Sequence, residues 1–180
     1  VEEDELFLTG FDQSSALATL APAISRAERL LLFTKIIMAK PIEYGIEKLA
    51  ANQACYLAQE LANLIDTVHN QGLSFDRLTD LVPEEYAVHW QETLKFLQII
   101  TEYWPQILAE RQLIDASDRR NRLLRAQIDL WRQNPPVKRI VAAGTTAAFP
   151  LMKELVKTVL SLEKGELYLA GIDKFLEDEA

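Results

Sequence analysis

The chain contains the stretch RIVAAGTTAAFPLMKELVKTVLSLEKGELYLAG over residues 139–171, and the period of its apolar residues changes twice. RIVAAG (139–144) is short, contains β-branched residues and ends in glycine, which is typical of a strand. PLMKELVKTVLSL (150–162) has helical spacing, and ELYLAG (166–171) again has the character of a strand. The connection is long enough for a parallel crossover. Because two parallel strands cannot bury both of their faces alone, we expect an incomplete piece of a larger α/β sheet.

The residues before this unit follow helical periods. Ser25 and Glu28 have the spacing of a capping box, and the apolar run that follows predicts a helix over 26–40. Apolar residues at three- and four-residue steps predict a second, long amphipathic helix from about Ile46 to Gly72.

Two further helices are predicted before the first strand. A long one begins near Glu84, and we expect it to bend near Tyr103 because Pro105 removes one backbone donor. The next runs from a turn at 115–117 to about Gln133, where two prolines end it. The predicted fold class is therefore mainly α, with a helical domain over 1–135 and the parallel strand-helix-strand piece over 136–180.

The composition is that of an ordinary globular protein of one domain, or of one domain with an appendage: 180 residues, 49% hydrophobic and 26% charged. No apolar stretch approaches the roughly 20 residues of a membrane span. The single cysteine, Cys55, gives no disulfide framework, so a cytoplasmic location is expected. Cys55 itself is interpreted as a small buried hydrophobe. The acidic start without methionine suggests a chain that begins inside something longer.

Charge restricts where nucleic acid could bind. The net charge of -8 argues against a protein whose whole surface holds DNA, so any contact must be local. The segment 119–139 is strongly basic, and a helical projection places four of its arginines opposite Leu124 and Trp131. Such a face could follow a phosphate backbone, although an exposed face that pairs with acidic neighbours is the favoured alternative. The candidate nucleic-acid-binding residues are Arg119, Arg122, Arg125, Arg132, Lys138 and Arg139.

The turn after the first strand is the second candidate site. Gly144, Thr145 and Thr146 stand where amide donors and a helix dipole could hold an anion. The turn lacks the lysine and the second glycine of a phosphate loop, so a plain strand-to-helix turn with Pro150 at the first helical position is the preferred interpretation. The threonines are then only capping candidates.

No catalytic or metal-ligating set emerges from the remaining residues. His69 and His89 are too far apart to form a local ligand pair, and surface or helix-end roles are preferred for them. The three tryptophans occupy core-like helical positions: Trp90, Trp104 and Trp131.

Two longer stretches carry a family resemblance: LVPEEYAVHWQETLKFLQIITEYWPQILAERQLIDASDRRNRLL (81–124) and NPPVKRIVAAGTTAAFPLMKELVKTVLSLEKGELYLAGID (134–173). They resemble the amino-terminal region of one bacterial type of AddB, and the similarity covers nearly the whole chain. The specific features are the order of HWQ, a Trp-Pro kink, the AERxxID turn with its paired arginines, and a strand-AAGTT-helix-strand that ends in Gly-Ile-Asp.

The resemblance implies a part of a larger DNA-repair machine. AddB pairs with AddA in a helicase-nuclease that resects double-strand breaks for recombination, and its front half is similar to a superfamily I helicase without ATP-hydrolysing motifs. Residues 1–135 would then be a helicase 1B-like insertion, and 136–180 a fragment of the degenerate core. Ile140 to Gly144 would occupy the strand that normally ends in magnesium-binding carboxylates. Here Ala143, Gly144, Thr145 and Thr146 end it, so we expect no magnesium site.

The function implied is that of a non-catalytic scaffold that shapes the DNA channel or contacts an AddA-like subunit. The phosphate loop, the second helicase half and the nuclease are absent from this stretch, so no catalytic residue and no cofactor are transferred. Whether the chain is an enzyme stays uncertain: the fragment itself is expected to be inactive, while the parent belongs to an ATP-dependent helicase and exonuclease. The expected partners are DNA and the AddA-like subunit, without a membrane. Two alternatives remain open: a helical protein-interaction module, and a small enzyme that binds a phosphate ligand at the Gly144 turn.

Overall fold

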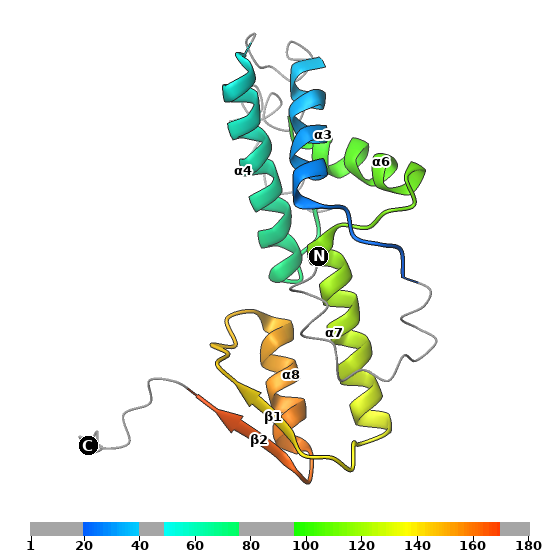
Figure 1. Ribbon diagram of the computed structural model, residues 1–180, viewed down its shortest axis with the longest axis vertical. Helices are drawn as coiled ribbons and strands as arrows, with labels where there is room; N and C mark the ends of the chain where they lie inside the picture. The colour runs from blue at the N-terminus through cyan, green and yellow to red at the C-terminus, as the bar shows by residue number, and fades with distance from the viewer. Residues whose placement is uncertain (1–19, 40–48, 76–95, 170–180) are drawn as a thin grey trace, which may run out of the picture. The chain divides into compact units, whose positions relative to one another are not determined.

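The computed structural model describes residues 20–39, 49–75 and 96–169. This part of the chain is mainly helical with a two-stranded parallel sheet, as the sequence predicts (Figure 1). The chain divides into two compact units, residues 1–121 and 122–180, and the division falls within a helix, ahead of Pro135. The elements are α3 (Arg26–Ala39), α4 (Ala51–Asn70), the π-helix η3 (Ile99–Tyr103), α6 (Trp104–Glu110), α7 (Ala116–Gln133), β1 (Ile140–Ala143), α8 (Pro150–Ser161) and β2 (Gly165–Tyr168).

Among the described residues, none of the helices combines the length and the apolar character that crossing a bilayer requires.

Helix α3 begins at the predicted cap. The backbone N–H of Glu28 donates to Ser25 Oγ over 3.2 Å, which is one half of a capping box. The Glu28 carboxylate, however, accepts a hydrogen bond from Arg111 and so does not return to the cap. Phe33 and Ile37, four residues apart, are buried on the side of α3 that packs against α4.

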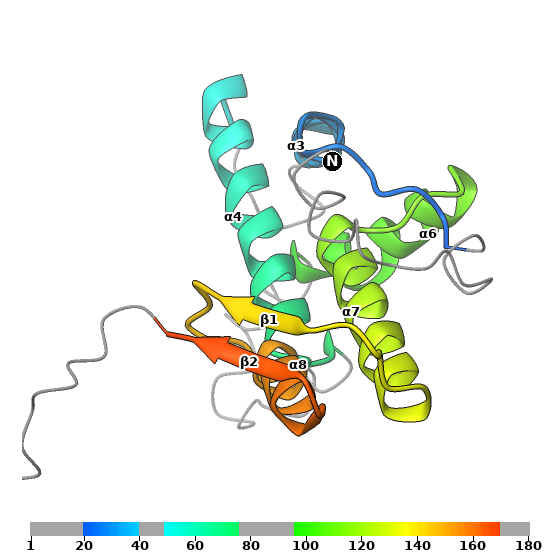
Figure 2. The ribbon, with the colours of Figure 1, turned by 60° about the horizontal axis from the view of Figure 1, so that its bottom comes forward.

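Helix α4 begins at Ala51; the earlier start that the sequence predicts, near Ile46, lies outside the described residues. It ends before Gly72, whose φ of +67° is a conformation that favours glycine. Ala54, Ala58 and Ala62 lie on its buried side, so α3 and α4 run side by side (Figures 1 and 2). The prediction that Cys55 is buried was wrong: its thiol is exposed, because the residue lies one position beyond Ala54 and thus about 100° around the helix.

A π-helix stands where the sequence predicts a bend near Tyr103. The N–H of Trp104 donates to the carbonyl of Ile99, five residues earlier, over the segment Ile99–Tyr103. Proline has no N–H to continue the ordinary ladder, which explains why the helix changes its pattern here. The predicted start near Glu84, together with Trp90 and His89, lies outside the described residues.

The core of the first unit joins these helices. The rings of Phe33 and Trp104 lie 4.3 Å apart, centroid to centroid, at 45°. A short parallel bridge joins the segment before α3 to the segment before α7, because the N–H of Ile24 donates to the carbonyl of Ile114 over 2.9 Å. Its buried apolar residues are Ile24, Phe33, Ile37, Ala54, Ala58, Leu61, Ala62, Ile65, Ile99, Ile100 and Trp104.

The second unit contains the predicted strand-helix-strand. Strands β1 and β2 pair in parallel, with Ile140 opposite Gly165 and Ala143 opposite Tyr168. Helix α8 connects them and packs on one face of the sheet (Figure 2). On the other face Val141 and Tyr168 remain 46% and 55% exposed, so one face of this sheet lies open.

Gly165 is required by a close approach between β2 and the last turn of α8. A Cβ atom at this position would lie 1.7 Å from the carbonyl oxygen of Val159. No side chain larger than hydrogen fits there without a backbone shift.

Candidate nucleic-acid interface

Basic charge is concentrated in the second unit. Residues 122–180 contain nine Lys and Arg against eight Asp and Glu, a formal balance of +1, and the balance within 122–169 is +4 because four of these acidic residues lie in 170–180. Residues 1–121 contain ten against nineteen, a balance of -9. Since phosphate binding depends on locally clustered Lys and Arg, the second unit is the place to look for a DNA contact.

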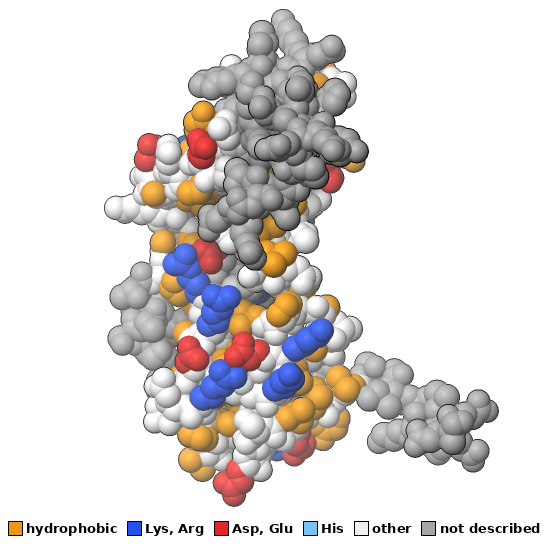
Figure 3. Space-filling model, turned by 180° about the vertical axis from the view of Figure 1, so that it is seen from behind, with side chains coloured by type: hydrophobic (Ala, Val, Ile, Leu, Met, Phe, Trp, Pro, Cys, Tyr) orange, Lys and Arg blue, Asp and Glu red, His pale blue; other side chains and the backbone are white. Residues whose placement is uncertain are grey.

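Helix α7 presents a mixed, mostly basic face to solvent. Its buried residues in the second unit, Leu123, Gln127 and Ile128, define the inner side. The exposed positions Arg122, Arg125, Asp129 and Arg132 recur at three- and four-residue steps, so they share the outer side. Figure 3 shows basic side chains interspersed with acidic and apolar ones on the face of the molecule that it displays.

Arg119 does not belong to this exposed face. It lies in the part of α7 that falls in the first unit and is half-buried, and its Nε is a buried atom without a hydrogen-bond partner among the described residues. Its neighbour Arg120 donates a hydrogen bond to Asn70 Oδ1, at the end of α4. Of the six candidates, Arg119 therefore has the least access to a phosphate.

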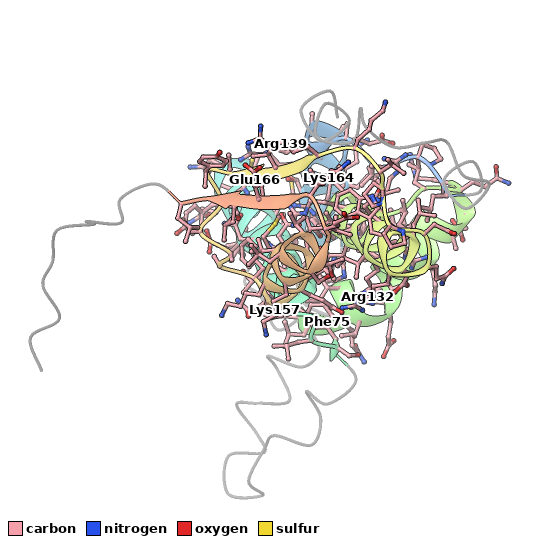
Figure 4. All side chains as sticks on the ribbon, turned by 90° about the horizontal axis from the view of Figure 1, so that it is seen from below. Phe75, Arg132, Arg139, Lys157, Lys164 and Glu166 are labelled. Carbon is pink, nitrogen blue, oxygen red and sulfur yellow. The ribbon has the colours of Figure 1, made fainter. Side chains whose placement is uncertain are left out.

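Arg132 forms an ion pair with α8. Its Nη2 lies 2.9 Å from Glu154 Oε1, and the two side chains are 51% and 46% exposed. Arg132 thus has the acidic neighbour that the favoured alternative expects. Lys157 lies one turn after Glu154 on α8, and Figure 4 shows Arg132 and Lys157 on these two helices.

Arg139 takes part in a three-membered polar group on the strands (Figure 4). It donates to Glu166 Oε2, and more weakly to the hydroxyl of Tyr168 at 3.3 Å. The same hydroxyl donates to Glu166 Oε2 over 3.0 Å. The hydrogen bond from Arg139, followed by the one from Tyr168, holds the pKa of Glu166 below its ordinary value, and the same carboxylate raises the pKa of Arg139. Lys138, the sixth candidate, is exposed just before β1.

Two backbone N–H groups of the Gly144 turn form hydrogen bonds within the second unit. Gly144 has a φ of +69°, and its N–H donates to the carbonyl of Tyr168. The N–H of Ala147 donates to Thr145 Oγ1 over 3.1 Å, so this donor and this acceptor are hydrogen-bonded to each other within the turn. Neither threonine caps α8, contrary to the sequence interpretation, because Phe149 is the capping residue and has no side-chain cap. Thr146 is exposed, and Pro150 stands at the first helical position as predicted.

A buried ionic network in the first unit escaped the sequence analysis. Arg29 of α3 makes two hydrogen bonds to Asp66 of α4, at 2.7 and 2.9 Å, and a third to Asp115, just before α7, at 2.7 Å. Asp115 is 2% exposed and also accepts the indole N–H of Trp104 over 2.9 Å. Burial alone would raise the pKa of Asp66, but the hydrogen bonds and charge of Arg29 outweigh it and hold this pKa below its ordinary value.

One corner of this network brings together the residue types of a nucleophile and its base. His69 Nδ1 lies 2.8 Å from Ser117 Oγ, and that hydroxyl lies 3.4 Å from Asp115 Oδ1. Ser117 is buried, however, and Asp115 accepts hydrogen bonds from Arg29 and from the indole of Trp104, which indicates a structural role for these residues. The amide of Asn121 also donates to the carbonyl of His69, so these contacts tie the end of α4 to the start of α7. No group of three or more His, Cys, Asp or Glu within the described ranges is arranged to hold a metal ion.

No protein-family profile matches this chain, and neither the curated proteins nor the solved structures contain a match to it.

Proposed function

We propose that this chain is a non-catalytic part of an AddB-like subunit of a DNA-break-repair complex, and that its second unit contacts the DNA backbone through α7. The single observation that carries the DNA contact is the exposed arginine face of α7, in the less acidic of the two units. A cytoplasmic location, where a bacterial chromosome is repaired, is part of the proposal. So are an AddA-like subunit as partner and a helicase-like origin of both units.

The order of the elements supports the assignment to an AddB-like subunit. A helical unit is followed by a parallel strand-helix-strand, which is the arrangement that the resemblance implies. Strand β1 ends at Ala143 and is followed by Gly144, where an active helicase would place magnesium-binding carboxylates. That difference supports a scaffold role for this segment.

The chemistry of the contact is phosphate recognition by guanidinium groups. Arg122 and Arg125 are three residues apart, which corresponds to about 4.5 Å along an α-helix. Two long side chains at this spacing can reach neighbouring phosphates, and arginine holds a phosphate by paired hydrogen bonds. Binding of this kind does not read base sequence and weakens steeply with salt.

The test compares two charge-matched double variants of the full chain. Arg122→Gln with Arg125→Gln removes two charges from α7, and Arg26→Gln with Lys35→Gln removes two exposed charges from α3. Fluorescence anisotropy with an end-labelled duplex should show weaker binding, and a salt slope reduced by about 1.8, for the α7 variant only. Equal weakening of duplex binding in both variants would mean that only the net charge of the chain matters, which would contradict the proposal.

A helical protein-interaction module is the second candidate, and one observation favours it. Leu31 and Met38 are 53% and 49% exposed, and their separation of seven residues puts them on one side of α3. If this side contacts an AddA-like subunit, Leu31→Gln with Met38→Gln should abolish co-purification with that subunit, whereas Lys35→Gln should not. Retained co-purification of the double variant would exclude this contact.

A further inference from the structure

We infer that Glu154 and Glu166 are built-in competitors of DNA phosphate for Arg132 and Arg139, so that the second unit binds DNA more weakly than its arginines would allow. This inference deepens the proposed function and rests on it. It concerns regulation of DNA binding by the second unit: two of the candidate arginines already hold a carboxylate, and DNA must displace that carboxylate before it can use them.

Both pairs occupy positions where exchange is possible. Arg132 and Glu154 are about half exposed, and Arg139 is 58% exposed beside Glu166. Exposed ion pairs are weak and are screened by salt, so neither pair locks its arginine in place. A phosphate and a carboxylate accept hydrogen bonds from the same edges of a guanidinium group, so they compete directly.

The two carboxylates come from different elements of the strand-helix-strand. Glu154 lies in the second turn of α8 and reaches back to α7, whereas Glu166 lies on β2 and reaches across the sheet to the residue before β1. Tyr168 strengthens the second pair, because its hydroxyl donates to Glu166 and also accepts from Arg139. The fold of the second unit therefore places each carboxylate next to the arginine for which it competes with phosphate.

Loss of the two carboxylates would also change the local charge balance. The second unit, residues 122–180, would pass from +1 to +3 if both were replaced by glutamine. That change raises affinity for any polyanion through net charge alone, so the experiment must separate the released arginines from the general effect.

The experiment measures duplex binding by the full chain across a salt series. Glu154→Gln and Glu166→Gln are compared with Glu163→Gln, an exposed carboxylate of the same unit that provides the matched charge change. We expect each of the first two variants to bind more tightly at low salt, and to steepen the slope of log K against log salt by about 0.9, the value of one added phosphate contact. Glu163→Gln should leave the slope unchanged.

A second variant shows whether the arginine is the cause. Adding Arg132→Gln to Glu154→Gln should return the slope to that of the wild type. If the gain persists, or if Glu163→Gln gives the same gain, the competition is overturned while the proposed DNA contact stands. If neither the wild type nor any glutamine variant binds the duplex, the proposed function and this inference both fail.

Discussion

Arg29 of α3 and Asp115 of the turn before α7 form a buried ion pair, with 2.7 Å between Nη1 and Oδ1 and side chains that are 8% and 2% exposed. The two residues are 86 positions apart in the chain. Asp66 of α4 accepts hydrogen bonds from both Nη1 and Nη2 of the same guanidinium group. One arginine therefore connects three segments of the first unit.

Replacing Asp115 by alanine should destabilise the first unit by about 3 kcal/mol. The substitution leaves Arg29 with a single carboxylate and deprives the indole N–H of Trp104 of its acceptor. Urea unfolding followed by circular dichroism measures the loss. Glu28→Gln is the control, because it breaks the exposed Glu28–Arg111 pair and should cost less than about 1 kcal/mol. Equal effects of the two substitutions would refute the role given to the buried pair.

Trp104→Phe separates the hydrogen bond of this side chain from its packing. The new ring can keep the contact with Phe33, whereas the donor to Asp115 is lost. We expect a loss of stability of about 1.5–3 kcal/mol, the usual effect of one hydrogen bond to a charged acceptor. The half-buried Trp131 offers the comparison, and Trp131→Phe should cost less. A neutral Trp104→Phe would mean that the indole N–H contributes nothing.

Acid should weaken the first unit through Asp66. Because the pKa of Asp66 is lower in the folded chain than in the unfolded one, the unfolded state takes up its proton first as pH falls. The stabilisation is present in full above the unfolded pKa of aspartate, about 3.9, and is lost as pH falls through the folded pKa. Urea unfolding at a series of pH values should show this loss in the wild type. Asp66→Asn should be less stable at pH 7 and should show a flatter profile below pH 4, and an identical slope in the two proteins would contradict the linkage.

Gly165→Ala should disrupt the strand-helix-strand. The added methyl group would meet the carbonyl oxygen of Val159 at 1.7 Å, so the backbone must move, at a cost of about 3 kcal/mol. Gly144→Ala is the comparison, because its surroundings are open and only the positive φ opposes the change, at about 1 kcal/mol. Amide exchange of β1 and β2 reports the difference. Faster exchange in Gly144→Ala than in Gly165→Ala would reverse the expected order.

The sequence predicted those features that depend on neighbours along the chain. The start of α3 at Ser25, the end of α7 before Pro135 and the change of period at Ile140 all follow from local rules of capping, proline and apolar spacing. Pro105 led to the prediction of a bend near Tyr103, whereas the π-helix that the structure has at Ile99–Tyr103 was not predicted.

Features that depend on distant partners could not be predicted. Nothing near Arg29 indicates Asp66 or Asp115, and a charged residue one turn before Phe33 was the only local signal of a buried ion pair. Arg132 and Arg139 were recognised as basic, but their carboxylates come from α8 and β2, which only the fold brings close. The burial of Cys55 was predicted wrongly because the small residues Ala54 and Ala58 fill the buried side of α4. Cys55 follows Ala54 by one position and therefore faces solvent.

The measurement that tests the central claim most directly is the salt dependence of duplex binding by the wild-type chain, from about 50 to 200 mM salt, the range over which phosphate contacts lose affinity steeply. We predict binding whose logarithm falls linearly with the logarithm of salt, with a slope of about -2 or steeper, as expected if at least Arg122 and Arg125 each neutralise a phosphate. Absence of binding at the lowest salt, or binding that does not change with salt, would contradict the assignment of α7 as a DNA contact.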